Sequence, residues 1–142
     1  MAFVVKFDSS AIYKTLNPVN QYDINKLYGF TEGTDPHLNS ARIGWSWNDH
    51  ALRLYAYAYK NGERFSKEIA ITPLNKEIIC KISVAPGQYS FSVDGVTEVL
   101  PRAELPVTAT GYQLFPYFGG DETAPASIGI FIKEITSAST KI

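Results

Sequence analysis

Three tyrosines alternate with alanines at the end of the run Leu52–Tyr59, as Tyr55, Tyr57 and Tyr59. The run is rich in residues that favour strands, and side chains alternate between the two faces of a strand. The three rings are therefore expected on one face. Flat rings with hydroxyl tips pack well against the C–H faces of sugars, so this row is a candidate carbohydrate contact.

Two tight turns predict which residues accompany the tyrosines. Asn61-Gly62 is a type I′ hairpin signal because both positions tolerate positive φ, and Asp49-His50 is a second candidate turn. Counting outward from these turns places Tyr57 between Arg42 and Ser66. The whole predicted outer face comprises Arg42, Ser46, Arg53, Tyr55, Tyr57, Tyr59, Arg64, Ser66 and Glu68.

This face predicts a ligand-binding site. Its predicted residues are Arg42, Arg53, Tyr55, Tyr57, Tyr59 and Glu68. Arginine and glutamate side chains beside the rings could bind hydroxyl or carboxylate groups. Gly44 is expected to leave room for the ring of Tyr55, and Arg42 to contact Tyr57 through a cation–π interaction. Two other interpretations stay open: a solvated sheet with favourable Tyr–Arg pairs across strands, or a face that packs against another layer.

The other candidate residues indicate no particular reaction. His37, in a loop, and His50, in a turn, lack metal-ligand spacing, and there is no Gly-x-Ser-x-Gly string or phosphate-binding loop. His37 is a loop residue or, alternatively, an acid–base group near the tyrosines. Asp121 and Glu122 form an acidic surface turn or, alternatively, help to hold Ca²⁺. We predict no catalytic residue, no metal and no cofactor.

The elements that must position these residues are strands. Short β-rich runs are separated by Gly, Pro, Asn and Asp, which predicts an all-β fold, a two-sheet antiparallel sandwich of the jelly-roll type. The break at residues 101–111 is predicted to cross between the sheets. The predicted strands are Ala2–Phe7, Asp23–Phe30, Ser40–Trp47, Leu52–Tyr59, Phe65–Ile71, Glu77–Val84, Tyr89–Val93, Val96–Leu100, Tyr112–Tyr117 and Ile128–Ile135.

The same turns predict part of the core. The inward residues are Ile43, Trp45, Trp47, Leu52, Leu54, Ala56, Ala58, Phe65 and Ile69. Lys67 falls on this side as well, which requires a place at the rim or a bulge. Pro86-Gly87 and Asp94-Gly95 predict two further hairpins, of which the first pairs Ile82 with Phe91.

The length of 142 residues is that of one ordinary domain, predicted to span residues 1–136 before a polar tail at 137–142. The 13 basic and 14 acidic residues form no basic stripe, which argues against nucleic acid as a partner. No apolar run approaches the roughly 20 residues that span a membrane. Met1–Asp8 predicts a strand and not a signal peptide. Because a leader could have been removed, a secreted, cell-surface or cytoplasmic location stays open. The oligomeric state is open too.

Three strings carry a resemblance to known proteins: Asp23–Phe30, Ser40–Trp45 and Gly111–Pro125. They resemble small, poorly characterised bacterial β-sandwich proteins. The general layout resembles concanavalin A-like jelly rolls, which include lectins, carbohydrate-binding modules and alginate-type polysaccharide lyases. In the lyase comparison, Arg42 and Tyr112–Tyr117 loosely match two strands of the concave face, whereas the sequence contains no Gln-x-His string.

We therefore expect a non-catalytic carbohydrate-binding module whose partner is an oligosaccharide or polysaccharide. A polysaccharide lyase-like enzyme that uses tyrosine, arginine and His37 is the alternative. A structural or adhesion domain that uses the same face for protein contacts is the third interpretation. A shallow face favours the first, a deep groove with His37 or Glu68 against a tyrosine favours the second, and a self-complementary patch favours the third.

Overall fold

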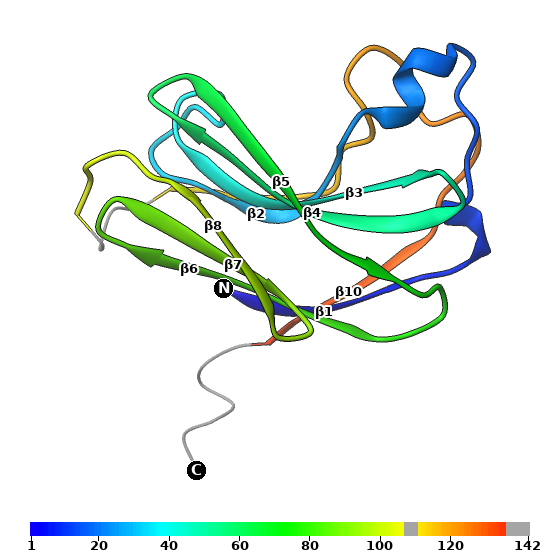
Figure 1. The fold of residues 1–142 in the computed structure, drawn as a ribbon. Coiled ribbons are helices and arrows are strands. Elements are labelled where there is room, and N and C mark those ends of the chain that lie inside the picture. The colour runs from blue at the N-terminus through cyan, green and yellow to red at the C-terminus, as the bar shows by residue number, and fades with distance from the viewer. Residues whose placement is uncertain (107–110, 136–142) are drawn as a thin grey trace.

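The computed structural model describes residues 1–106 and 111–135 and places them in two five-stranded antiparallel sheets that pack face to face (Figure 1). The strand order is β10-β1-β6-β7-β8 in the first sheet, sheet A, and β5-β4-β3-β2-β9 in the second, sheet B. The predicted all-β, two-sheet antiparallel sandwich is thereby confirmed.

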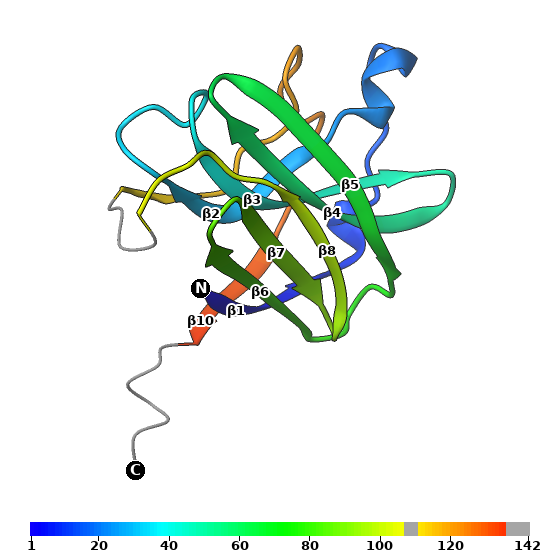
Figure 2. The same cartoon turned by 60° about the vertical axis from the view of Figure 1, so that its left-hand side comes forward.

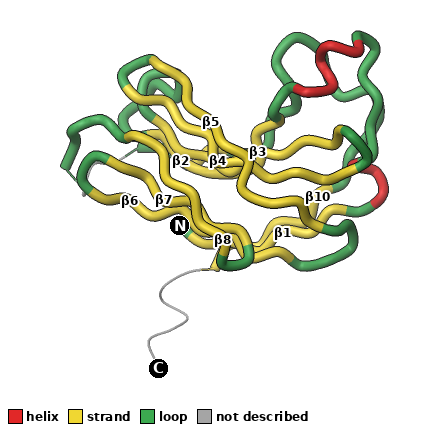
Figure 3. The backbone as a smooth tube through the Cα atoms, in the orientation of Figure 1, coloured by secondary structure: helices red, strands yellow, loops and turns green. Residues whose placement is uncertain are grey.

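The strands occupy the segments that were predicted as β structure. Two short 3-10 helices, η1 and η2, follow β1 and lie at the same end of the sandwich (Figure 3). The bounds are β1 Ala2–Phe7, η1 Ser9–Ala11, η2 Pro18–Tyr22, β2 Asn25–Thr31, β3 Ser40–Asn48, β4 Ala51–Lys60, β5 Glu63–Thr72, β6 Ile78–Ala85, β7 Gln88–Val93, β8 Val96–Pro101, β9 Gln113–Leu114 and β10 Ile130–Ile135.

The chain passes from one sheet to the other after β1, β5, β8 and β9 (Figures 1 and 2). The predicted crossover after β8 is therefore present, although its residues 107–110 lie outside the described part of the chain, as do the predicted tail residues 137–142. β9 is shorter than predicted because Pro116 cannot donate to a ladder, and Tyr117 pairs again as an isolated bridge to Lys26. None of the described helices is long and apolar enough to cross a membrane.

The two turns that flank β4 have the predicted left-handed backbone. φ is +48° at Asp49, +58° at His50, +48° at Asn61 and +84° at Gly62. Positive φ at both central residues is the type I′ pattern, whose twist matches that of the flanking strands. The register between β3, β4 and the first half of β5 is accordingly the predicted one.

Lys67 keeps the predicted inward register, opposite Ala56, and the irregularity in β5 begins only after it. A β-bulge shifts the pairing between β4 and β5, and Ile69 is the extra residue. Lys67 itself lies at the rim of the sandwich, with its side chain 53% exposed. Its Nζ is 4.0 Å from Oε2 of Glu98 on β8, so this ion pair joins the edge strands of the two sheets.

The core between the sheets is apolar and rich in aromatic rings. Trp45 is the largest fully buried side chain, with its ring centroid 5.0 Å from that of Phe7, 5.5 Å from Tyr13 and 6.4 Å from Phe118. Trp47, also predicted inward, is half-buried and packs at the margin of this core. The inward direction of the predicted core face is thereby confirmed.

A buried ion pair that the sequence analysis missed ties the sheets together. Arg102 follows β8 and Glu32 follows β2, and their side chains are 0% and 3% exposed. Arg102 donates from Nη2 and Nε to the two carboxylate oxygens, at 2.6 and 2.7 Å. The hydroxyl of Tyr89 donates to the same carboxylate. Burial alone would raise the pKa of Glu32, but the hydrogen bonds from Arg102 and Tyr89 outweigh it and lower that pKa.

Trp45→Ala tests the core. The substitution should lower the free energy of unfolding by roughly 3–5 kcal/mol, because it leaves a cavity among three aromatic rings. Val99→Ala, at a side chain that is 42% exposed, is the control and should change it by no more than about 0.5 kcal/mol. Urea denaturation measures both, and equal midpoints would show that Trp45 is not in the core.

Glu32→Gln tests the buried ion pair. It leaves the Arg102 guanidinium buried without a counter-charge, so we expect a loss of about 3–5 kcal/mol in the free energy of unfolding. Glu68→Gln is the matched control, because it weakens the partly exposed Arg53–Glu68 pair and should cost less than about 1 kcal/mol. The reverse ranking in the same denaturation assay would contradict the structure.

Candidate functional site

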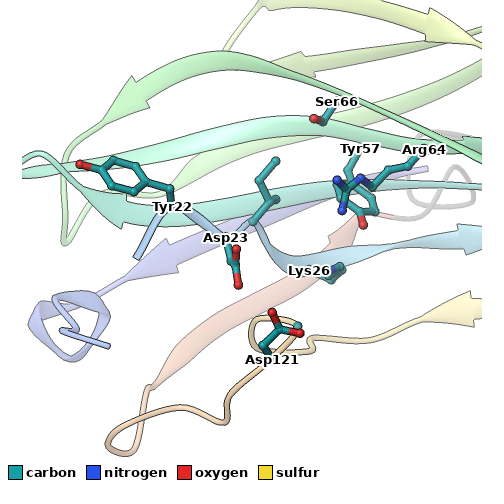
Figure 4. A pocket seen from close by; sticks show the side chains of 9 residues that line it. Tyr22, Asp23, Lys26, Tyr57, Arg64, Ser66 and Asp121 are labelled. Atoms are coloured by element: carbon teal, nitrogen blue, oxygen red, sulfur yellow. The ribbon is translucent and has the colours of Figure 1, made fainter. Parts of the chain in front are cut away.

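The outer face of sheet B carries a pocket of about 260 Å³ (Figure 4). Strands β2, β4 and β5 supply its floor. Residues 22–24, which lead into β2, form one wall, and residues 120–121, from the loop after β9, form the other. The residues that line it are Tyr22, Asp23, Ile24, Lys26, Tyr57, Arg64, Ser66, Gly120 and Asp121.

The first wall is the chain between η2 and β2. Asn17 caps η2 by accepting a backbone hydrogen bond at 3.1 Å, and Pro18 occupies the first turn, where a missing N–H is tolerated. Ile24 then packs over Gly44, since a Cβ on that glycine would lie 2.4 Å from Cγ2 of Ile24. The space above Gly44 is thus filled by Ile24, whereas the prediction reserved it for the ring of Tyr55.

The second wall is the loop after β9, whose first residues run alongside β2. Lys26 and Tyr117 exchange two backbone hydrogen bonds, of 2.8 and 3.0 Å. The buried side chain of Asn25 accepts a hydrogen bond from the backbone of Gly119 at 2.6 Å, and Nζ of Lys26 donates to the Gly119 carbonyl at 3.2 Å. Gly119 has a φ of +61°, a left-handed conformation that favours glycine and turns the chain toward Asp121.

Glu122 fastens the two walls together. Its carboxylate accepts hydrogen bonds from the backbone of Leu16 at 3.0 Å and of Asn17 at 3.3 Å, and from Nδ2 of Asn20 at 2.8 Å. The segments lie side by side in Figures 1 and 2, as the blue η2 and the orange loop. These hydrogen bonds, chiefly that from Asn20, lower the pKa of Glu122 from its ordinary value of 4.5.

Tyr57 forms part of the floor and is only 3% exposed. Nζ of Lys26 lies 5.0 Å from the centroid of its ring, in a cation–π contact for which the sequence analysis expected Arg42. The ring of Tyr59 packs edge-on at 6.0 Å. Burial, and after it Tyr59, raises the pKa of the Tyr57 hydroxyl. A ring so covered is no open stacking platform.

Three cations gather around Tyr57. Arg42 is only 8% exposed, and its Nε has no hydrogen-bond partner among the described residues. No carboxylate of a described residue lies within 4.0 Å of Lys26, Arg42 or Arg64. Burial lowers the pKa of Arg42 and of Lys26, and the two arginines lower that of Lys26 further. This end of the pocket is therefore positively charged.

Of the six predicted site residues, Tyr57 lines the pocket and Arg42 lies buried near it. The others bind partners within the protein. Arg53 and Glu68 form an ion pair of 3.2 Å, and the hydroxyl of Tyr55 is 2.7 Å from Oγ of Ser46. The predicted face exists, but its open part lies toward β2 and the two walls.

Tyr59 contacts the loop that contains His37. The two rings pack edge-on with centroids 5.4 Å apart, and the His37 side chain is 75% exposed. His37 thus lies beside the tyrosine row, as one interpretation expected, but it does not line the pocket.

Five lining residues were not predicted from the sequence: Tyr22, Asp23, Ile24, Lys26 and Gly120. Asp121 was interpreted as part of an acidic surface turn or of a Ca²⁺ site. One signal was available. Lys26 pairs with Gly44, an outer-face position, so extending the alternation to β2 would have included it. The wall residues depend on long-range contacts of Glu122 and Asn25, which no local pattern announces.

Other chemistry finds little support in the described residues. No three His, Cys, Asp or Glu side chains converge there in a way that could hold a metal ion. Cys80 lies in the core, where burial raises the pKa of its thiol to about 12, so it is protonated and unreactive at neutral pH. Asp23 and Asp121 remain as carboxylates that can accept hydrogen bonds in the pocket.

No known protein family matches the chain, and neither the curated proteins nor the solved structures contain a match to it. The geometry of the pocket is therefore the basis for a functional proposal.

The hydrogen bonds that Glu122 accepts from the segment around η2 should weaken in acid, when its carboxylate is protonated. A carboxylate with a lowered pKa stabilises the fold above its ordinary value of 4.5, and this contribution is lost as the pH falls through its lower folded value. We expect the amide resonances of Leu16 and Asn17 to titrate with a midpoint below 4.5. In Glu122→Gln this titration should vanish. A midpoint at or above 4.5 would show that the folded protein does not hold the Glu122 carboxylate through these hydrogen bonds.

Proposed function

We propose that the protein binds one sugar unit of an oligosaccharide or polysaccharide in the pocket on the outer face of sheet B. The observation that carries this proposal is the set of polar groups of both signs in one pocket, with the exposed ring of Tyr22 at its edge (Figure 4). Tyr22 is 62% exposed, and its hydroxyl lies 3.3 Å from Oδ1 of Asp49, which helps to orient the ring.

Sugar hydroxyls both donate and accept hydrogen bonds, so a sugar site needs partners of both kinds. Asp23 and Asp121 supply acceptors, and Lys26, Arg64 and Ser66 supply donors, all within the lining of one pocket. An aromatic ring adds an apolar surface for the C–H face of the sugar. This combination supports a carbohydrate over an apolar ligand.

The dimensions support recognition of a single ring. The volume of about 260 Å³ falls just below the range of about 300–1,000 Å³ of pockets that enclose drug-sized ligands. A pocket of this size accepts one unit of a chain and leaves its neighbours in solvent. Binding that relies on one stacked ring and a few hydrogen bonds should be micromolar to millimolar, about −8 to −4 kcal/mol.

The expected resemblance to concanavalin A-like carbohydrate-binding proteins agrees with this proposal, which places the ligand on a sheet face. A non-catalytic role is favoured over a lyase-like one because His37, the sequence-derived candidate for the base, lies outside the lining. The structural or adhesion interpretation is an outcome of the test below.

A glycan array followed by calorimetry tests the proposal. Tyr22→Ala should weaken binding about tenfold, which corresponds to roughly 1.4 kcal/mol, because it removes the stacking ring. Phe131→Ala is the matched control, since Phe131 is a 55% exposed ring on β10 of sheet A, and it should leave the affinity unchanged.

Three other outcomes would overturn the proposal. Binding that survives Tyr22→Ala would place the site elsewhere. Shortening of the polymer, or new unsaturated ends that absorb in the ultraviolet, would show an enzyme. No binding to any glycan, together with a dimer that buries this face, would establish the structural interpretation.

A further inference from the structure

We infer that the sugar unit bound in this pocket carries an anionic group, a carboxylate or a sulfate ester, which lies against Lys26 and Arg64 with Arg42 behind them. The inference rests on the proposed function and names the class of sugar.

Arg42 is buried without a counter-charge among the described residues. Burying a charged side chain is costly unless a counter-charge or hydrogen bonds compensate for it. Arg42 is 8% exposed, its Nε has no partner among the described residues, and no described carboxylate lies within 4.0 Å of its guanidinium. The contrast is Arg102, also buried, which donates to both oxygens of Glu32. An anion near Arg42 would supply part of the missing compensation.

Two further cations, Lys26 and Arg64, lie nearby without a described carboxylate within ion-pair distance. Lys26 is held by the ring of Tyr57 at 5.0 Å and the carbonyl of Gly119 at 3.2 Å, so its ammonium is fixed at the pocket. Arg64, opposite Tyr59 on the neighbouring strand, is exposed and lines the same pocket. Like charges held together repel each other, and an anionic ligand relieves that repulsion.

The groups along the pocket are arranged in an order that suits an acidic sugar. In Figure 4 Tyr22 and Arg64 lie at opposite ends, with Asp23 and Asp121 between them. A neutral sugar could accept hydrogen bonds at the cationic end but would leave its charge uncompensated. A uronate or a sulfated sugar can direct its hydroxyls to the aspartates and its anionic group to Arg64, where charge-assisted hydrogen bonds form.

Three oligosaccharides of the same length and linkage provide the test: a neutral one, one with uronate units and one with sulfate esters. Calorimetry at low salt should show at least about tenfold tighter binding of one acidic form than of the neutral form. The preference should shrink toward 1 M salt, where the screening length falls to about 3 Å. The uronate and sulfate arms distinguish the two sources of the charge.

Arg64→Gln should lower the affinity for the acidic form more than the affinity for the neutral form, and so reduce the preference, because it removes an exposed charge of the pocket without disturbing the core. Lys67→Gln, at an exposed cation on the rim of the sandwich, is the matched control and should keep the preference. Equal affinity for neutral and acidic forms would overturn this inference while the proposed function stands. No binding of any of the three would overturn the proposed function, and this inference with it.

Discussion

Two turns, at Asp49–His50 and Asn61–Gly62, set the geometry on which both faces of sheet B depend. Each has positive φ at its two central residues, so each joins its strands in one register. Side chains alternate along a strand, and a shift by one residue would exchange the two faces, turning Trp45 to solvent and Tyr57 into the sandwich. The burial of Trp45 and the place of Tyr57 in the pocket floor are thus two consequences of one constraint.

The flat face becomes a pocket because distant segments of the chain are fastened onto it. Glu122 binds the segment around η2, and Asn25 holds the backbone of Gly119, so both walls are tied to β2 or to each other. The sandwich beneath is held by the buried pair of Arg102 and Glu32. In contrast to these paired groups, Lys26, Arg42 and Arg64 around Tyr57 have no described carboxylate within 4.0 Å. These three cations give the proposed site its charge.

The fold was predictable because its signals are local. Turn residues and alternation gave the strands, the register of β3 and β4, and the core position of Trp45. Of the two explanations offered for Lys67, the place at the rim is the one that applies, because the bulge at Ile69 follows Lys67 and leaves its register unchanged. The site was only half predictable, because alternation places Tyr57 on the outer face but does not say what covers it. The segment that contains Tyr22 is placed at the edge of the face by contacts between residues more than a hundred positions apart, which no local pattern encodes.

The most direct test of the account is to map the bound sugar onto the backbone by NMR, with an acidic oligosaccharide titrated into the isotopically labelled protein. The account predicts that the largest amide shift changes cluster at residues 22–26, at Tyr57 and Arg64, and at residues 119–121. It also predicts that the amides of sheet A stay unchanged. Shift changes centred on the opposite sheet, or on the separate pocket between Trp47 and Leu74, would contradict it.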